Sequence, residues 1–470
     1  MKKLSPKRFV IFLLWVVLAV YLSCCVIVPL FHKKVSQSQL DTASTLLQQP
    51  VHGAPEQILC VDQNEEALLW RLRLIRSAQE RLVMTTFAFS DDNSGTDLLS
   101  ALYDAAQRGV QIQILIDGMD GTLNLSHSPL LGALTTLPNV EAKLYNPLNL
   151  LKPWRLNYRM HDKYVISDDT AYLLGGRNTN DLFLGEYAQK CNIDREILVW
   201  QTQPGKGQSF LELQDYFQTI WEMPCSKSIS PRVSEKKLES AFASLKEHFL
   251  LLEQRFPAAF EPVNWAEETI PANSVHLLHN PQQPQNKEPL LWSSLCELMN
   301  NSSDILIQTP YVICNRSMYD DLTALEGDGR QIKIITNAIA SGANPWGCSD
   351  YLNQKKNILK TGAEIYELYG ERSSHTKTMV LDDRLSVVGS FNLDMRSAYL
   401  DTEMMLLIDC PELNQQLRNQ ASKTMERSNH VLPDGTQTPG EQYHPPKVGW
   451  MRLAIYQVLR ILILPIRHLL

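Results

Sequence analysis

Two separated copies of one six-residue pattern constrain this chain more than any other feature. The first copy is His161, Lys163, Asp168, Gly175, Gly176 and Asn178, and the second is His375, Lys377, Asp382, Gly389, Ser390 and Asn392. In both copies, Lys follows His by two positions, Asp follows Lys by five and Gly follows Asp by seven. A single His-x-Lys tripeptide arises by chance, whereas six positions recurring at identical spacing indicate an internal duplication.

Each copy predicts two short strands joined by a turn. Apolar runs follow the two histidines at 164–166 and 379–381. Such runs are typical of buried strands, on which residues two apart point to the same face. Each His-Lys pair therefore converges on one small anion. An Asp-Asp pair then makes the turn, so we assign Asp168 and Asp382 a structural role.

The second strand of each copy ends in Gly-Gly or Gly-Ser. At this point the backbone can approach a ligand closely, which makes Gly176 and Ser390 candidate substrate-binding positions. Asn178 and Asn392 follow directly and can add amide donors.

The similarity between the two halves extends beyond the motif. The matched apolar strands are 82–87 and 305–309, 110–117 and 331–337, 140–145 and 363–368, and 194–198 and 401–405. Their alternation with helices indicates α/β lobes with mixed sheets flanked by helices. A period of about 210–220 residues is too long for a solenoid and means two similar lobes. Pseudo-twofold symmetry between the lobes would bring both motif strands to one cleft.

The sequence divides into five expected segments. These are an N-terminal membrane anchor (1–34), a first lobe (55–225), a helical insertion and linker (226–286), a second lobe (287–430), and a flexible connection with an interfacial amphipathic helix (431–470). We expect the insertion to act as a spacer or as a cover over the cleft.

The duplicated His-x-Lys-x4-Asp pattern resembles the phospholipase D superfamily. Local segments are similar to bacterial cardiolipin synthases of the C type, namely 156–163, 175–178, 388–392 and 396–404. The resemblance covers about residues 55–430 and implies two phospholipase D-like lobes. Gly176 departs from the superfamily pattern, which has the serine found at Ser390, although a Gly-Gly variant also fits the C-type synthases.

The residue types of the motifs suit phosphodiester chemistry. The anionic oxygens of a phosphodiester repel nucleophiles, and Lys163 and Lys377 can neutralise that charge. One neutral imidazole can attack phosphorus and form a covalent phosphoryl-histidine. The other, protonated, can donate to the leaving alkoxide and later deprotonate an alcohol or water. Because two lysines supply positive charge, we expect no metal and no other cofactor. The resemblance implies His161 as nucleophile and His375 as acid/base, but symmetry leaves that order open.

Four charged residues near the motifs are further candidates. A carboxylate should orient each imidazole, and Glu196 and Glu403 are the repeat-matched choices. The alternative for both is a charge at the surface end of a strand. Arg159 and Arg177 are candidates for holding a second phosphate, or else form ion pairs at the cleft rim.

The N-terminal region predicts a membrane anchor. Residues 9–30 form an uncharged apolar run of 22, long enough to span a bilayer. The alternatives are a cleaved signal peptide or a lipoprotein site at Cys24. Basic residues lie before the run at Lys2, Lys3, Lys7 and Arg8 and after it at Lys33 and Lys34. This bias predicts that the lobes lie on the outer side. With the resemblance to bacterial synthases, we expect a single-pass protein of the cell membrane.

The C-terminal region 450–470 is rich in Leu and Ile, with interspersed Arg452, Arg460 and Arg467. This pattern favours a helix in the membrane interface, with arginines near lipid phosphates, over a spanning helix. The alternative is a terminal helix packed on the protein core. Trp154, just before the first motif, either enters the interface or is buried.

Charge and cysteine content narrow the function further. The net charge of −7 gives no basic footprint, which argues against nucleic acid as a partner. The nine cysteines lack a Cys-x-x-Cys pair and suggest neither a zinc site nor a disulfide framework. Free thiols fit poorly with an oxidising exterior, which counts against the outer location.

We therefore favour phosphatidyl transfer between membrane phospholipids. The C-type resemblance implies phosphatidylglycerol as acceptor and phosphatidylethanolamine as donor, giving cardiolipin. The alternative is a phospholipase D-type hydrolase or a membrane-anchored nuclease that uses water as acceptor. A scaffold with an inactive site is disfavoured because both motifs are complete at His, Lys and Asn. The sequence does not reveal whether a protein partner activates the enzyme.

Overall fold

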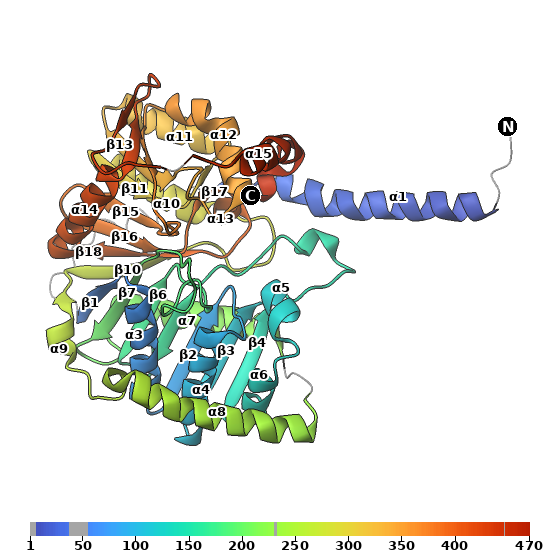
Figure 1. Ribbon diagram of the computed structural model, residues 1–470, viewed down its shortest axis with the longest axis vertical. Helices are drawn as coiled ribbons and strands as arrows, with labels where there is room; N and C mark the ends of the chain where they lie inside the picture. The colour runs from blue at the N-terminus through green and yellow to red at the C-terminus, as the bar shows by residue number, and fades with distance from the viewer. Residues whose placement is uncertain (1–5, 37–54, 230–232, 446) are drawn as a thin grey trace.

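The computed structural model describes residues 6–36, 55–229, 233–445 and 447–470. These residues form two α/β lobes, each built on a nine-stranded sheet, and a long N-terminal helix that projects from the body (Figure 1). The predicted fold class, two similar lobes with mixed sheets flanked by helices, is confirmed.

The first sheet carries the first motif near its centre. Its order is β8 (Ser226–Ser228), β4 (Val140–Tyr145), β3 (Gln111–Asp117), β2 (Arg81–Thr86), β5 (Tyr164–Ser167), β6 (Ala171–Gly175), β7 (Glu196–Gln201), β1 (Glu56–Val61) and β9 (Ile270–Pro271). Strands β2, β3 and β4 are parallel, and every other neighbouring pair is antiparallel.

The second sheet repeats eight of these strands in the same order, and its ninth strand lies at the other edge. Its order is β20 (Gln437–Pro439), β19 (Ser428–Val431), β14 (Glu364–Leu368), β13 (Gln331–Asn337), β11 (Asp304–Gln308), β15 (Thr378–Leu381), β16 (Leu385–Gly389), β18 (Met404–Asp409) and β10 (Ser274–His279). The parallel strands are again the three central ones, β11, β13 and β14. The duplication read from the motif is therefore a duplication of whole sheets.

Helices cover the sheets. In the first lobe they are α3 (Asn64–Ser77), α4 (Asn93–Gln107), α5 (Gly118–Asp120), α6 (Pro129–Leu134), α7 (Gln208–Glu222), α8 (Glu235–Arg255) and α9 (Trp265–Glu268). In the second they are α10 (Leu290–Asn300), α11 (Arg316–Gly327), α12 (Pro345–Leu359), α13 (Met395–Tyr399), α14 (Pro411–Glu426) and α15 (Trp450–Leu462). Local sequence explains several starts: the side chains of Asp92, Asn315 and Asn344 accept backbone N–H groups at the beginnings of α4, α11 and α12.

The two lobes share one apolar core. A buried cluster takes Val83, Ile166 and Leu174 from the first sheet and Leu306, Val388 and Leu406 from the second. Two further clusters lie within the individual lobes, beneath their helices. A shared core of this kind fixes the position of one motif relative to the other, because packed interiors do not deform continuously.

The segment 226–286 is part of the lobes rather than a separate insertion. Strand β8 joins the first sheet and β10 joins the second. Helix α8 lies along the outer face of the first lobe, where it packs on α4 and α6, far from the junction with the second lobe (Figure 1). It does not cover the cleft.

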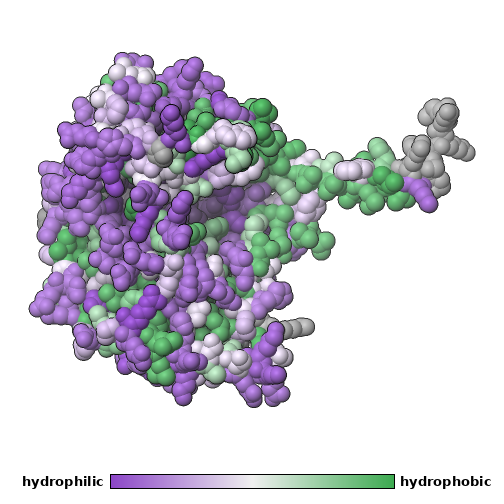
Figure 2. Space-filling view, in the orientation of Figure 1, coloured by the Kyte–Doolittle hydropathy of each residue, from purple (hydrophilic) through white to green (hydrophobic). Residues whose placement is uncertain are grey.

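Helix α1 (Pro6–Ile27) leaves the body with its apolar side chains exposed (Figures 1 and 2). Within the described residues it provides the one helix, Phe9–Leu30 with the following turn, that is long and apolar enough to cross a membrane. Its inner end is held by both halves of the chain. Asn157 Nδ2 donates to Cys25 O (2.7 Å) and Asn286 Nδ2 donates to Val28 O (2.8 Å).

The C-terminal helix α15 is amphipathic, but its arginines face the protein. Arg452 donates to Ala340 O (2.9 Å) and Gly342 O (2.7 Å), and Arg460 Nε donates to Asn353 Oδ1 (2.8 Å). The predicted contact of these arginines with lipid phosphates is therefore wrong, because backbone and amide oxygens of the second lobe already accept them. The exposed face is instead apolar, with Trp450, Met451, Ile455, Val458, Ile461 and Leu464.

Two smaller predictions are also decided. Trp154 lies in the short 3-10 turn Pro153–Arg155 and is 43% exposed, so it is not a core residue. All nine cysteines are free thiols.

Candidate active site

The two motif histidines lie where the lobes meet. The residue directly before each motif histidine forms a bridge with the opposite lobe. Met160 pairs with Thr402, and Ser374 pairs with Ile193. His161 N donates to Thr402 O (3.2 Å), and His375 N donates to Ile193 O (2.7 Å). Each histidine is thus positioned by the backbone of the lobe to which it does not belong.

Each imidazole also binds a carboxylate of the opposite lobe. His161 Nδ1 lies 2.9 Å from Glu403 Oε1, and His375 Nδ1 lies 2.6 Å from Asp194 Oδ2. Both carboxylates are fully buried. A carboxylate on Nδ1 fixes the orientation of the ring and leaves Nε2 as the nitrogen that can meet a substrate.

Glu403 is one of the two predicted orienting residues, but Glu196 does not orient an imidazole. Glu196 is buried in an ion pair with Arg71 (2.6 Å) and with Arg177 (3.5 Å). Asp194, two residues earlier, takes the position beside His375.

The register of the sheets explains this correction. Gly175 pairs with Glu196, whereas the equivalent Gly389 pairs with Met405. Glu196 therefore corresponds to Met405, and Asp194 corresponds to Glu403. The sequence match of Asp-x-Glu with Asp-x-Glu was shifted by two residues, which a strand pattern does not reveal because a shift of two keeps every side chain on its face.

Both motif lysines are buried beside their histidines, each with 1% of its surface exposed. Each Nζ donates to the carbonyl of its own histidine, and Lys377 Nζ lies 3.8 Å from Asp194 Oδ2. Burial lowers the pKa of Lys163 to about 7 and that of Lys377 to about 8. An anionic ligand would favour the charged form of both.

Charge acts across the junction as well as within each motif. Burial is the main cause that lowers the pKa of His161 well below its ordinary value, and Lys163 and then Lys377 add to it. The pKa of His375 falls to about 4 through burial and Lys377, with a contribution from Lys163. Since each imidazole is influenced by the ammonium groups of both motifs, the two His-Lys pairs form one electrostatic site.

The two orienting carboxylates differ in ionisation. Burial would raise the pKa of Asp194, but the charges of Lys377 and His375 bring it down to about 2. Burial raises the pKa of Glu403 to about 8, against the opposing effects of Lys163 and of hydrogen bonds from Ser390 and Ser397. At neutral pH, Asp194 is therefore the stronger anion.

Gly176 and Ser390 occupy equivalent positions, and each lies beside one of the two orienting carboxylates. A Cβ atom on Gly176 would lie 2.5 Å from both carboxylate oxygens of Asp194, so no side chain fits there. On the other side, Ser390 Oγ donates to Glu403 and is fully buried. The structure therefore places Gly176 and Ser390 beside the two orienting carboxylates. Their contact with the substrate stays a prediction.

The two asparagines lie at equivalent positions behind the glycines. The Oδ1 atoms of Asn178 and Asn392 are buried and have no hydrogen-bond partner in the described part of the chain. Asn392 Nδ2 donates to the hydroxyl of Tyr311 (3.3 Å).

Asp168 and Asp382 lie at the opposite ends of the motif strands from the histidines. Both have positive φ, +48° and +46°. Asp168 accepts backbone N–H groups of residues 79–81 at 2.8–2.9 Å, and Asp382 accepts those of residues 303 and 304 at 2.9 and 3.0 Å. They tie the motif turn to the start of the neighbouring strand and do not reach the histidines.

Arg159 and Arg177 are structural residues rather than phosphate ligands. Arg159 is bound to Asp117 (3.3 Å) and to Asn146 O (2.7 Å). Arg177 is fully buried and donates to Val61 O (3.0 Å) and to other acceptors around it. Both guanidinium groups are used by acceptors within the first lobe, so the prediction that they hold a second phosphate is wrong.

Sequence reasoning missed two aromatic neighbours of the site. Phe87 meets the ring of His161 edge-on at 5.1 Å between ring centres, and Phe183 meets His375 in the same way at 5.0 Å. Phe87 directly follows β2 and so could have been suspected. Phe183 lies in a loop, and no sequence signal marks it.

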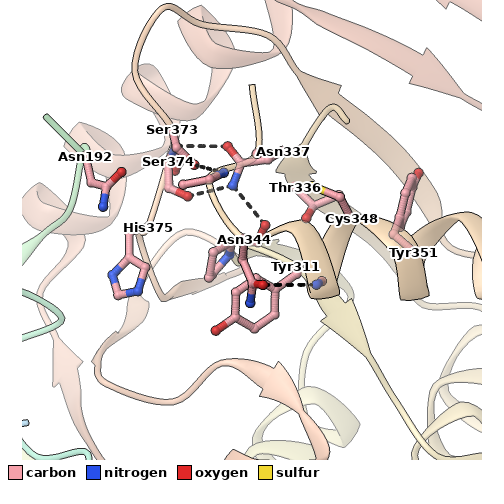
Figure 3. A pocket seen from close by; sticks show the side chains of 14 residues that line it. Asn192, Tyr311, Thr336, Asn337, Asn344, Cys348, Tyr351, Ser373, Ser374 and His375 are labelled. Atoms are coloured by element: carbon pink, nitrogen blue, oxygen red, sulfur yellow. Dashed lines mark hydrogen bonds between the residues drawn. The ribbon is translucent and has the colours of Figure 1, made fainter. Parts of the chain in front are cut away.

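A recess of about 420 Å³, including the part open to solvent, lies beside His375 (Figure 3). Apolar atoms make up most of its surface, and the polar side chains of Asn192, Asn344, Ser373 and Ser374 also line it. Asn337 holds its wall by accepting Ser374 N (2.9 Å) and donating to Ser374 O (2.7 Å). The recess can receive a small hydroxyl-bearing group next to the second imidazole. Among the described residues, no group of three or more His, Cys, Asp and Glu is arranged to hold a metal ion.

Comparison with known proteins gives concordant matches. The family described as cardiolipin synthase, phospholipase D-like domain, matches residues 72–221 and 295–425. Cardiolipin synthase C of Escherichia coli is 28% identical over 403 residues, which cover 76% of this chain and 82% of that protein. An uncharacterised protein of Helicobacter pylori is 25% identical over 431 residues, covering 83% of each chain. The crystal structure of phosphatidylserine synthase from Haemophilus influenzae shares the fold, with a TM-score of 0.60 at 17% identity over 90% of this chain and 97% of that one.

Proposed function

Because this chain belongs to the cardiolipin synthase family of phospholipase D-like proteins, and is thus a phospholipid phosphatidyltransferase, we propose that it makes cardiolipin from phosphatidylglycerol and phosphatidylethanolamine. The observation that carries this proposal is the junction at which two His-Lys pairs meet, each imidazole bound to a carboxylate of the opposite lobe. We infer a covalent phosphatidyl-histidine intermediate.

The first half-reaction forms the phosphatidyl-histidine intermediate. His161 Nε2 attacks the phosphorus of the donor, and the bond from phosphorus to the head-group oxygen breaks. The leaving alkoxide takes a proton from His375 Nε2 and departs as ethanolamine. Burial and Lys377 lower the pKa of His375 to about 4, and the ionised Asp194 on Nδ1 opposes that shift. We infer that the negative charge of the bound phosphodiester, together with Asp194, keeps His375 protonated for this step.

The second half-reaction transfers the phosphatidyl group from His161 to the acceptor. Neutral His375 takes a proton from the primary hydroxyl of the glycerol head group of phosphatidylglycerol, whose oxygen attacks phosphorus. The bond between phosphorus and His161 Nε2 breaks, and cardiolipin is released. The recess beside His375 supports this order, since one space next to the acid/base can hold first the leaving and then the entering head group.

The lysines and asparagines act on the phosphate itself. Lys163 and Lys377 offset its negative charge, which would otherwise repel the imidazole. Asn178 and Asn392 can donate from their amide Nδ2 groups to the phosphate oxygens.

The same site could use water and act as a hydrolase, because the loaded intermediate is common to both reactions. Purified full-length protein, labelled phosphatidylglycerol and added phosphatidylethanolamine separate the two. Labelled cardiolipin that increases with phosphatidylethanolamine supports the proposal. Phosphatidic acid as the sole lipid product contradicts it, and degradation of single-stranded DNA without lipid turnover would support a nuclease.

The apolar helix α1 fits a membrane-anchored protein of a bacterium. We infer that the lobes lie on the outer side of the cell membrane, because more basic residues precede the span than follow it. Protease added to intact spheroplasts should then digest the body. Digestion only after lysis would place the body in the cytoplasm.

The exposed apolar face of α15 supports a second membrane contact. Trp154, with Leu150 and Leu151, is exposed in the first lobe, and its turn packs against α1. The chain end following α15 also contacts the anchor, since His468 Nε2 lies 2.7 Å from Val26 O. These apolar groups lie near the point where the anchor enters the body, so they would rest on the same bilayer surface.

A further inference from the structure

A larger polar groove continues from the recess beside His375. The two share Asn192, Gly342, Ala343 and Ser373 in their walls. The groove has a volume of about 1560 Å³ including the part open to solvent. Its walls come from both lobes, with 189–192 on one side and 369–373 on the other. The face in Figure 2 is hollowed between the lobes, with hydrophilic residues around the hollow.

The groove is lined by three basic side chains, Lys190, Arg372 and Arg452, and by one carboxylate, Glu371. Arg452 is occupied, since it donates to Ala340 O and Gly342 O and so holds α15 at the groove wall. The other two cations are available. Lys190 is exposed and has no ion pair within the described residues, and Arg372 has a single exposed partner, Glu186, at 3.5 Å.

The acceptor phosphatidylglycerol carries a phosphate of its own, so the reaction needs a second phosphate-binding position besides the one between the two motifs. In phosphatidylglycerol, three carbons separate the attacking hydroxyl from the lipid's own phosphate. While the hydroxyl is at His375 and the transferred phosphorus is between the motif pairs, the acceptor phosphate must lie a short distance away. Arg159 and Arg177 are buried and engaged elsewhere, so they cannot serve it.

We propose that Lys190 and Arg372 bind the phosphate of the acceptor phospholipid, whose glycerol head group enters the recess beside His375. The assignment rests on the proposed transferase function and specifies its acceptor. Arg452, in the first turn of α15, also lines the groove, and the exposed face of that helix is apolar. The acyl chains of an acceptor held in this way can therefore stay in the bilayer.

A charge-removal experiment tests the subsite. Lys190→Gln/Arg372→Gln is made in the full-length protein, and transfer from phosphatidylethanolamine is measured with two acceptors, phosphatidylglycerol and free glycerol. Only phosphatidylglycerol carries the anion. Loss of two charge-assisted contacts should lower the ratio of kcat/KM for phosphatidylglycerol to that for glycerol about tenfold.

The matched control is Arg316→Gln/Lys360→Gln, which removes the same charge from exposed positions on α11 and after α12. It should keep the wild-type acceptor ratio. An unchanged ratio in Lys190→Gln/Arg372→Gln, or an equal fall in the control, would overturn the assignment.

A binding measurement separates this inference from the proposed function. Dihexanoyl-phosphatidylglycerol is titrated calorimetrically into the full-length His161→Ala protein with and without the two groove substitutions. Weaker binding when both are present, in low salt more than in high salt, supports the subsite even if no cardiolipin is ever formed. Equal binding rejects the subsite even if the wild-type protein makes cardiolipin.

Discussion

At the scale of single residues, the site is symmetric in layout and asymmetric in chemistry. Asp194 is short, ionised and close to Gly176, whereas Glu403 is one carbon longer, has a raised pKa and is bound by Ser390 and Ser397. One imidazole thus has a strong anion on Nδ1 and the other a weaker one. This difference gives the two histidines different tasks, with the proton carried by the one bound to Asp194.

Substitutions of Asp194 and Glu196 distinguish a carboxylate that orients His375 from one that stabilises the fold. Asp194→Asn should lower kcat by roughly 10²–10⁴, because His375 loses the anion that supports its charged form. Glu196→Gln should keep most of the turnover but lower the free energy of unfolding by about 3 kcal/mol, because Arg71 and Arg177 remain buried without a counter-charge. Steady-state rates and chemical denaturation measure the two effects. Catalytic loss in Glu196→Gln as large as in Asp194→Asn would contradict the assignment.

The pH dependence should report the buried lysines. Burial lowers the pKa of Lys163 to about 7 and that of Lys377 to about 8, so their charge is lost as pH rises through that range. The phosphodiester stays anionic throughout, and its binding weakens as the ammonium groups deprotonate. We expect kcat/KM to fall above about pH 7–8, far below the ordinary titration of lysine.

The pH dependence of kcat, measured at saturating phosphatidylethanolamine, is the internal control for the pH dependence of kcat/KM. A bound anion favours the charged lysines, so the alkaline fall in kcat should occur at higher pH than the fall in kcat/KM. Measurements at constant ionic strength compare the two curves. A kcat/KM that stays flat to about pH 10 would show that these lysines do not carry titrating charge at the site.

At the scale of elements, the sequence predicted the central strands because their apolar runs are long and regular. The short edge strands β8, β9, β19 and β20 were not predicted, since two to four residues carry no usable period. The motif located His161, His375 and their lysines. Asp194 was missed because its role depends on strand register, and Arg159 and Arg177 were misassigned because only tertiary packing shows which acceptors surround them.

The exposed apolar face of helix α15 predicts a contact with the membrane surface. Ile455 and Ile461 are 55% and 71% exposed, although their helix has polar residues turned toward the protein. Ile455→Glu/Ile461→Glu should lower the rate on phospholipid vesicles, relative to the rate on detergent-dispersed lipid, at least about fivefold, because charged groups leave the membrane interface. The control is Leu250→Glu/Leu251→Glu on α8, with 51% and 54% exposure on the outer face of the first lobe. Equal losses in both variants would remove α15 from membrane contact.

At the scale of the whole molecule, duplication creates a site that neither half contains. The shared core fixes the sheets against each other, and each lobe supplies the backbone and the carboxylate that position the other's histidine. The inner end of α1 is fastened to residues of both halves, at Asn157 and Asn286. The anchor therefore orients the junction relative to the bilayer, which suits a reaction between two lipids.

Detection of the covalent intermediate tests the account most directly. Full-length protein is mixed with labelled phosphatidylethanolamine without acceptor, denatured at mildly alkaline pH, which preserves both the phosphorus–nitrogen bond and the acyl esters, and digested for mass spectrometry. The account predicts a phosphatidyl group on the peptide that contains His161, removed by a chase with phosphatidylglycerol and absent from His161→Ala. A phosphatidyl group on His375 instead, or cardiolipin formation without any adduct, would contradict it.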